Sequence, residues 1–179
     1  MLNPEEAVLI VVDVQGKLAR IVNESEIIIG QIQKLIQGIK LLNIPILLTN
    51  QVPEKLGSTI DEVASLLPDH EQISRTSFSI FREVNMLTKL AELQRKQIIL
   101  CGFEAHICLY QSAMDLLGAD FKVYLVVDCV SSRVQTNKEI AIKNIVQAGG
   151  KLTTVEMALF ELIRDVRNPV FRSVSKIIK

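Results

Sequence analysis

Short segments rich in apolar or β-branched residues alternate with longer segments of helical periodicity along the chain. Residues 7–12 read Ala-Val-Leu-Ile-Val-Val and end at Asp13, and similar segments span 45–49, 97–102, 122–128 and 151–155. A strand that is apolar at every position, and not only at alternate ones, is typical of a parallel sheet that helices cover on both faces. The pattern therefore predicts strands in these five segments.

Helices are expected between these strands. Residues 25–42 carry apolar side chains at 28, 32, 35, 36, 39 and 42, which places them on one helical face. Gly149 and Gly150 stop a helix before the last strand. This alternation favours a three-layer α/β/α fold with a mainly parallel, Rossmann-like sheet of about six strands. The 179 residues suit one domain over 1–179, and ligands of such folds bind beyond the carboxyl ends of the strands.

Charge and hydropathy restrict the class of partner. The chain has 20 basic and 20 acidic residues and no net charge, so it offers no electrostatic footprint to nucleic acid. The N-terminal segment lacks the basic-then-apolar pattern of a signal peptide. The apolar runs are far shorter than the ~20 residues that cross a bilayer. We expect a cytoplasmic protein with neither nucleic acid nor membrane as a partner.

The three cysteines do not form the pattern of a disulfide framework, because their number is odd. Cys101 and Cys129 adjoin strand segments and are predicted to be small buried residues. Cys108 instead begins the helical segment 108–117. The N–H groups and dipole at a helix N-terminus favour a thiolate and can hold an oxyanion. Cys108 is therefore a nucleophile candidate, and the alternative is a cysteine packed in the first helical turn.

Other polar residues follow the strands. Asp13 ends an apolar strand, where it is either a proton shuttle beside a thiol or a helix cap or salt-bridge partner. Asp128 is expected to bind the Ser131–Ser132 turn. The segment 74–81 is either a surface loop anchored by its two phenylalanines or a pocket wall with Arg75 directed at Asp13 and Cys108. His106 is either a pocket residue or, as the more expected interpretation, an exposed loop residue.

Three motifs in chain order resemble the isochorismatase-like cysteine hydrolase superfamily. They read Val-Val-Asp-Val-Gln at 11–15, Arg-Thr-Ser-Phe-Ser at 75–79 and Gly-Phe-Glu-Ala-His-Ile-Cys at 102–108. The segments 128–133 and 147–156 add to a likeness that covers essentially the whole chain. Within this superfamily, the sequence most resembles the branch of isochorismatase-domain-containing proteins related to YcaC-type hydrolases.

The resemblance implies an Asp–Lys–Cys catalytic set. Asp13 matches the aspartate that shuttles protons, and Cys108 matches the cysteine that forms a thioester. The oxyanion hole falls on the backbone N–H groups of Glu104 and Cys108, and a cis Phe103–Glu104 peptide bond is expected before it. Arg75 stands where lysine is expected; it keeps the positive charge but donates no proton at neutral pH.

No cofactor and no metal are expected. The chain has only two histidines and no glycine-rich phosphate loop. The superfamily's nicotinamidases carry a histidine-rich metal site near the end of the second strand, whereas residues 49–55 here contain no histidine.

We therefore predict a metal-independent cysteine hydrolase that acts on a small amide, ester or related C–N substrate. The change to Arg75 leaves an alternative, a catalytically weakened or inactive relative that binds small molecules or serves as an oligomeric interaction protein. A thiol-based redox responder is a third possibility, without an evident resolving cysteine.

Self-association is expected, because relatives form dimers and rings and the apolar segment 170–178 can pack on a neighbour. The predicted substrate pocket is lined by Gln15, Leu18, Gln51, Phe78, Phe81, Phe103 and His106.

Overall fold

The computed structural model describes residues 1–179 and contains one six-stranded sheet. All pairings are parallel, and the strand order is β3-β2-β1-β4-β5-β6. The strands are β1 (Ala7–Val12), β2 (Ile46–Gln51), β3 (Gln72–Arg75), β4 (Gln97–Phe103), β5 (Lys122–Ser131) and β6 (Lys151–Thr153). The predicted fold class is confirmed.

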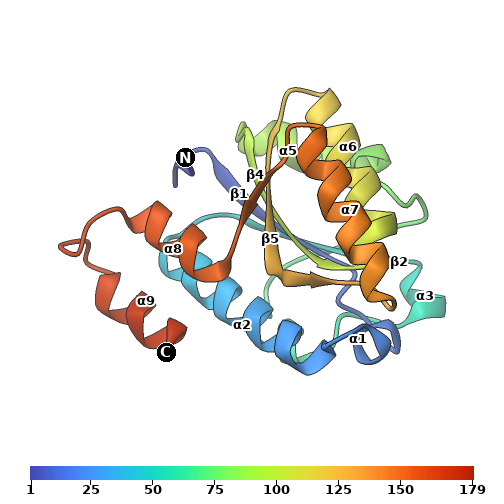
Figure 1. The fold of residues 1–179 in the computed structure, drawn as a ribbon, viewed down its shortest axis with the longest axis horizontal. Coiled ribbons are helices and arrows are strands. Elements are labelled where there is room, and N and C mark those ends of the chain that lie inside the picture. The colour runs from blue at the N-terminus through green and yellow to red at the C-terminus, as the bar shows by residue number, and fades with distance from the viewer.

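Helices cover both faces of the sheet, as Figure 1 shows. On one face lie α2 (Ser25–Leu41), α8 (Val155–Ile163) and α9 (Phe171–Ile178), and on the other lie α5 (Val84–Leu93), α6 (Tyr110–Gly118) and α7 (Gln135–Gln147). The remaining elements are the short helices α1 (Leu18–Ile21), α3 (Pro53–Leu56) and α4 (Asp61–Ala64), the 3-10 turn η1 (Ile80–Arg82) and the π turn η2 (Ala105–Leu109).

The central strand explains why apolar runs mark this fold. Leu9 and Val11 of β1 pack into the core under α2 and α8, whereas Val8, Ile10 and Val12 pack into the core under α5, α6 and α7. Successive side chains of a strand point to opposite faces, so a strand covered on both sides must be apolar throughout. Each fully buried side chain of this kind contributes roughly 1.5–3 kcal/mol of transfer free energy.

Three local predictions differ from the structure. Strand β3 is absent from the five predicted strands, because it is an edge strand whose alternating burial leaves too few apolar residues to mark it in the sequence. Strand β5 continues beyond Asp128, and that carboxylate does not bind the Ser131–Ser132 turn; it accepts the backbone N–H of Val155 at 3.0 Å and caps α8. The corrected role follows from the carboxylate's affinity for a helix N-terminus.

The C-terminal segment packs within its own chain. Val174 of α9 is fully buried, Phe171 meets Phe160 of α8 edge to face at 6.1 Å, and Lys34 Nζ of α2 donates to the carbonyl of Ile178 at 3.1 Å. The apolar residues of 170–178 are thus used at least partly inside the molecule, and self-association stays a prediction.

The order of the strands sets where a ligand can bind. Strands β2 and β3 follow β1 toward one edge of the sheet, and β4 then lies on the other side of β1. In open parallel sheets, the crevice at such a reversal, beyond the carboxyl ends of the strands, is the usual ligand site. Here the reversal lies between β1, which leads into Asp13, and β4, which leads into Glu104 and η2.

We predict that Gly102→Ala destabilises the fold by about 3 kcal/mol, because this residue needs a glycine. Its φ is +128°, and a Cβ atom there would lie 2.0 Å from the carbonyl oxygen of Val12 on the neighbouring strand. The free energy of unfolding is measured by chemical denaturation. Gly30→Ala, in the interior of α2 with nothing within 4 Å, is the control and should gain about 0.5–1 kcal/mol. Equal stability of Gly102→Ala and the parent would contradict the prediction.

Candidate active site

The residues that follow three adjacent strands have left-handed backbones. Asp13 follows β1 with φ 54°, Val52 follows β2 with φ 41°, and Glu104 follows β4 with φ 55°. A non-glycine residue in this region is uncommon, and for β-branched valine it is a genuine outlier. Such strain, of order 1–3 kcal/mol per residue, is concentrated at functional sites. The sharp turns bend the chain away from the sheet and open a crevice above the strand ends.

A buried ion pair lies at the base of this crevice. Arg75 Nη2 contacts Asp13 Oδ2, and the two side chains are 0% and 2% exposed. Arg75 Nη1 also donates to the carbonyl of Ser77. The second carboxylate oxygen, Asp13 Oδ1, is buried and accepts no hydrogen bond of ordinary geometry. Burial raises the pKa of Asp13, and the charge of Arg75 opposes this shift. An unpartnered carboxylate oxygen with a raised pKa is suited to accept a proton.

Cys108 lies in the π turn η2, next to this ion pair. Its thiol is 3.7 Å from Oε1 of Gln51, and the residue is only 3% exposed. Ser112 fixes the turn, because its hydroxyl donates to the carbonyl of Cys108 at 2.5 Å and accepts the N–H of Ile80 at 3.0 Å. Those contacts join η2 to η1, which follows the segment that carries Arg75.

Cys108 does not begin helix α6, so the predicted stabilisation of its thiolate by a helix N-terminus is wrong. Cys108 is the fourth residue of η2, and α6 begins only at Tyr110. Burial, followed by the negative charge of Asp13, raises the pKa of Cys108 to about 12, although Arg75 opposes the shift. The resting side chain is therefore a thiol at neutral pH, and it needs a base when it reacts.

The Phe103–Glu104 peptide bond is trans, because the chain contains no cis peptide bond. The expected cis bond is thus corrected. The chain turns instead through the left-handed conformation of Glu104 itself. The N–H of Glu104 has no hydrogen-bond partner within the chain. An N–H group must be free in this way to receive an oxyanion.

One cavity of about 410 Å³ contains the reactive groups. Of the residues predicted to line it, Leu18, Gln51 and Phe78 do so, together with Asp13, Glu104 and Cys108. The cavity has further lining residues that sequence reasoning missed: Lys17, Ile21, Lys55, Leu56, Ile107 and Arg133. They come from turns after β1, β2, β4 and β5, and the position of each turn beyond a strand is the signal that could have found them.

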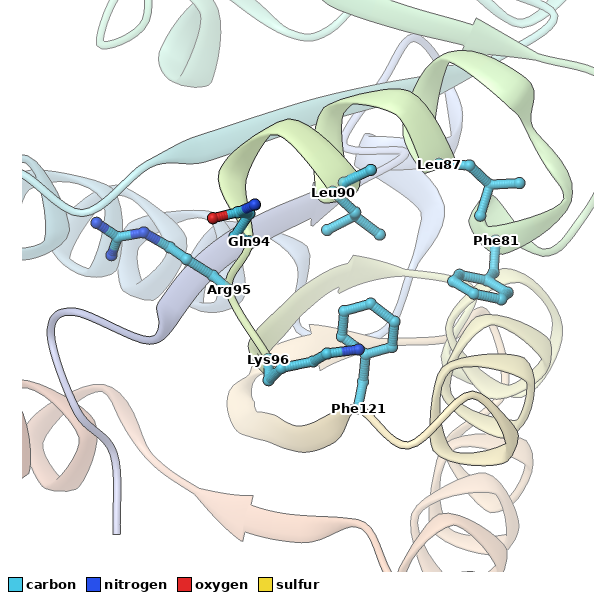
Figure 2. A pocket seen from close by; sticks show the side chains of 8 residues that line it. Phe81, Leu87, Leu90, Gln94, Arg95, Lys96 and Phe121 are labelled. Atoms are coloured by element: carbon cyan, nitrogen blue, oxygen red, sulfur yellow. The ribbon is translucent and has the colours of Figure 1, made fainter.

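Four predicted lining residues lie elsewhere. Phe81 is in a separate groove, edge to face with Phe121 at 5.8 Å (Figure 2). Phe103 is fully buried in the core under α2 and α8. His106 is half-buried, with Nδ1 3.1 Å from Ser132 Oγ and Nε2 3.6 Å from Glu104 Oε2. Alternation along β4 and the turn after it directs Phe103 and His106 away from the cavity, whereas Phe81 lies on η1.

Gln15 is the fourth of these, and it has a structural role. Its side-chain amide donates to the carbonyls of Gln51 at 3.0 Å and Gly57 at 2.7 Å, and its Oε1 accepts the N–H of Gln51 at 2.7 Å. It is fully buried. These three bonds clamp the turn that carries Lys55 onto the end of β1, so Gln15 shapes the cavity from behind its wall.

The charges around the cavity are mostly paired. Glu104 binds Arg133, with Nε and Oε1 3.1 Å apart, just as Asp13 binds Arg75. No group of three or more His, Cys, Asp or Glu side chains is placed to hold a metal ion.

A buried cysteine, a carboxylate and a cation at the reversal point of a parallel sheet define an isochorismatase-like α/β protein. The isochorismatase domain model matches residues 7–157, and the chain therefore belongs to the isochorismatase family, whose hydrolase fold it shares. The curated "Secreted isochorismatase effector Isc1" of Phytophthora sojae is 37% identical over 180 residues, 98% of this chain and 86% of that protein.

Solved structures agree with this assignment. The structure of MAR1 ribonuclease from Caenorhabditis elegans matches with a TM-score of 0.94 and 34% identity, over 99% of this chain and 91% of that one. The YcaC gene product of Escherichia coli, described as an octameric hydrolase of unknown specificity, matches with a TM-score of 0.93 and 23% identity, over 99% and 88% of the two chains. At that identity the second likeness shows the fold alone.

No helix of the structure has the length and apolar character required to cross a membrane. The Phytophthora sojae relative is described as secreted, so the cytoplasmic location expected from the sequence stays a prediction.

We predict that iodoacetamide alkylates Cys108 of the free protein at neutral pH at least roughly tenfold more slowly than an unperturbed thiol, because only the thiolate reacts. The labelling rate should keep rising above pH 10, as the raised pKa requires. Labelling is followed by mass spectrometry, with Cys108→Ser as the control that locates the label. A rate that reaches its plateau below pH 8 would contradict a raised pKa.

Proposed function

We propose that this protein is a metal-independent cysteine hydrolase that acts on a small amide, ester or related C–N substrate. The observation that carries the proposal is that Cys108 and Asp13 line one cavity, with Arg75 bound to the buried carboxylate. A thiol, a proton acceptor and a fixed cation are the groups that acyl transfer through sulfur requires.

The first half of the reaction forms a thioester. The Cys108 thiol proton passes to Asp13, and the sulfur attacks the substrate carbonyl carbon. The carbonyl π bond opens, and the backbone N–H groups of Glu104 and Cys108 receive the oxyanion. When the tetrahedral intermediate collapses, the C–N or C–O bond breaks and Asp13 returns the proton to the leaving amine or alcohol.

The second half regenerates the enzyme. Water attacks the thioester carbon while Asp13 takes one of its protons, the C–S bond breaks, and the proton returns to the sulfur as the carboxylic acid leaves. Arg75 supplies a fixed positive charge throughout and does not transfer a proton, because a guanidinium stays protonated at neutral pH. The Cys108–Asp13 pair carries one negative charge before and after the proton moves from sulfur to carboxylate, and Arg75 counters that charge in both states.

The test is a panel of small amides and esters, in which hydrolysis is followed by product release and the acyl-enzyme by intact mass. We expect a +acyl adduct on Cys108, and loss of turnover by roughly a thousandfold or more in Cys108→Ala and Asp13→Asn, as for other nucleophile and base deletions. Asp120→Asn is the matched control. It makes the same substitution at an exposed left-handed residue, φ 60°, and should leave turnover unchanged.

Stoichiometric binding without any adduct or turnover would instead favour the alternative, a family member that binds small molecules without hydrolysing them. The panel also contains a single-stranded RNA, because the Caenorhabditis elegans relative is described as a ribonuclease. We expect no RNA cleavage, since a chain of zero net charge offers no overall electrostatic attraction to a phosphate backbone.

The pH dependence of kcat/KM gives a separate prediction. Asp13 must be ionised to accept the thiol proton, so activity should fall as the pH drops through its pKa. Burial raises that pKa, and the acid limb should therefore lie above the ordinary aspartate value of about 3.9. The profile is measured with an ester that is stable over the pH range, and an acid limb at or below the ordinary value would contradict the assignment of Asp13.

A further inference from the structure

Two lysines at the cavity mouth have no partner. Lys17 follows β1 and Lys55 lies on α3, and both side chains line the cavity that contains Cys108. Both residues are exposed, and neither forms an ion pair or a side-chain hydrogen bond within the chain. The other charges of the cavity cancel, because Arg75 balances Asp13 and Arg133 balances Glu104.

The cavity therefore has a local excess of two positive charges in a chain whose net charge is zero. A concave site lined by one sign of uncompensated charge raises the local concentration of oppositely charged ligands. Lys17 and Lys55 are exposed, whereas Cys108 and Asp13 are only 3% and 1% exposed. We therefore expect an anion held by the lysines to lie on the solvent side of the bond that breaks.

Apolar side chains also line the cavity. Ile21, Leu56 and Phe78 line the cavity and are 47%, 47% and 51% exposed, which is unusual for such large side chains. Leu18 and Ile107 line it as well. Exposed apolar side chains gathered at a cavity are typical of a ligand-binding surface.

We propose that the substrate is an anionic acyl compound with three parts: a reactive amide or ester group at Cys108, an apolar body against Ile21, Leu56 and Phe78, and a terminal anionic group, a carboxylate or a phosphate monoester, held by Lys17 and Lys55. This assignment rests on the proposed function for the reactive end alone. Selectivity for an anion at the mouth follows from the lysines whether or not the protein turns over a substrate.

The test compares two reagents that alkylate the same thiol, anionic iodoacetate and neutral iodoacetamide, at pH 8.5 and low salt. The ratio of their rates at Cys108 does not depend on the thiolate fraction, because both reagents react with the same sulfur. We expect the ratio to exceed that of a free thiol in the same buffer and to fall about fivefold in Lys17→Gln/Lys55→Gln. It should also fall as salt is raised, since both lysines are exposed to screening.

The matched control is Lys122→Gln/Lys176→Gln. It removes the same two charges from exposed residues at the start of β5 and on α9, outside the cavity. The control should keep the parent ratio. A parent ratio at or below that of the free thiol, or one that the Lys17→Gln/Lys55→Gln variant keeps, would overturn the proposal.

A second measurement identifies the anion. Protection of Cys108 from iodoacetamide is compared for 4-methylpentanoate, the neutral 4-methylpentan-1-ol and the phosphate monoester of that alcohol. We expect the carboxylate and the phosphate monoester to protect better than the alcohol, and only while both lysines are present. Equal protection by the alcohol, or protection by the anions that persists in Lys17→Gln/Lys55→Gln, would overturn an anion-binding mouth, and the relative protection by the two anions identifies which one the site prefers. Hydrolysis of neutral amides alone, with no lysine dependence, would leave the hydrolase proposal intact and reject the anionic substrate.

Discussion

The ion pair between Asp13 and Arg75 is the interaction on which the site depends. Its two charges come from the ends of β1 and β3, which lie on opposite sides of β2, so a long side chain must reach across the end of the middle strand. Taking both charges out of water is unfavourable, and removing either partner alone would leave an uncompensated buried charge. The pair is retained beside Cys108, where a fixed charge of each sign can control the protonation of a thiol.

Arginine changes how that control is exerted. A lysine ammonium would place a single point charge beside the aspartate, whereas the guanidinium of Arg75 contacts Asp13 with one nitrogen and the carbonyl of Ser77 with another. This fork fixes the carboxylate in one orientation and leaves Oδ1 unpartnered. In the proposed reaction, arginine therefore keeps the positive charge but donates no proton, and Asp13 carries out every proton transfer.

The sequence predicts the sheet better than the details of the cavity. Strands β1, β4 and β5 are apolar on both faces, so their composition identifies them as strands. Strand β3 is a short edge strand without that signal. The structure brings Asp13, Arg75 and Cys108 together. Their order along the chain and the motifs around them predict this grouping. The residues that line the cavity are harder to predict, because the directions of the Phe81, Phe103 and His106 side chains depend on local turns. The left-handed backbones of Val52 and Glu104 have no marker in sequence composition, since neither position holds a glycine.

Gly16 and Gly57 give the cavity an evolutionary constraint. A Cβ on Gly16 would lie 1.9 Å from the carbonyl of Leu56, and one on Gly57 would lie 2.9 Å from Cα of Gly16. The turns that carry Lys17 and Lys55 are therefore in backbone contact. Neither turn can be lengthened or shortened alone without displacing the other. Relatives that keep this glycine contact should diversify their ligands by exchanging side chains on a frame of constant length, and insertions should be tolerated elsewhere on the molecule first.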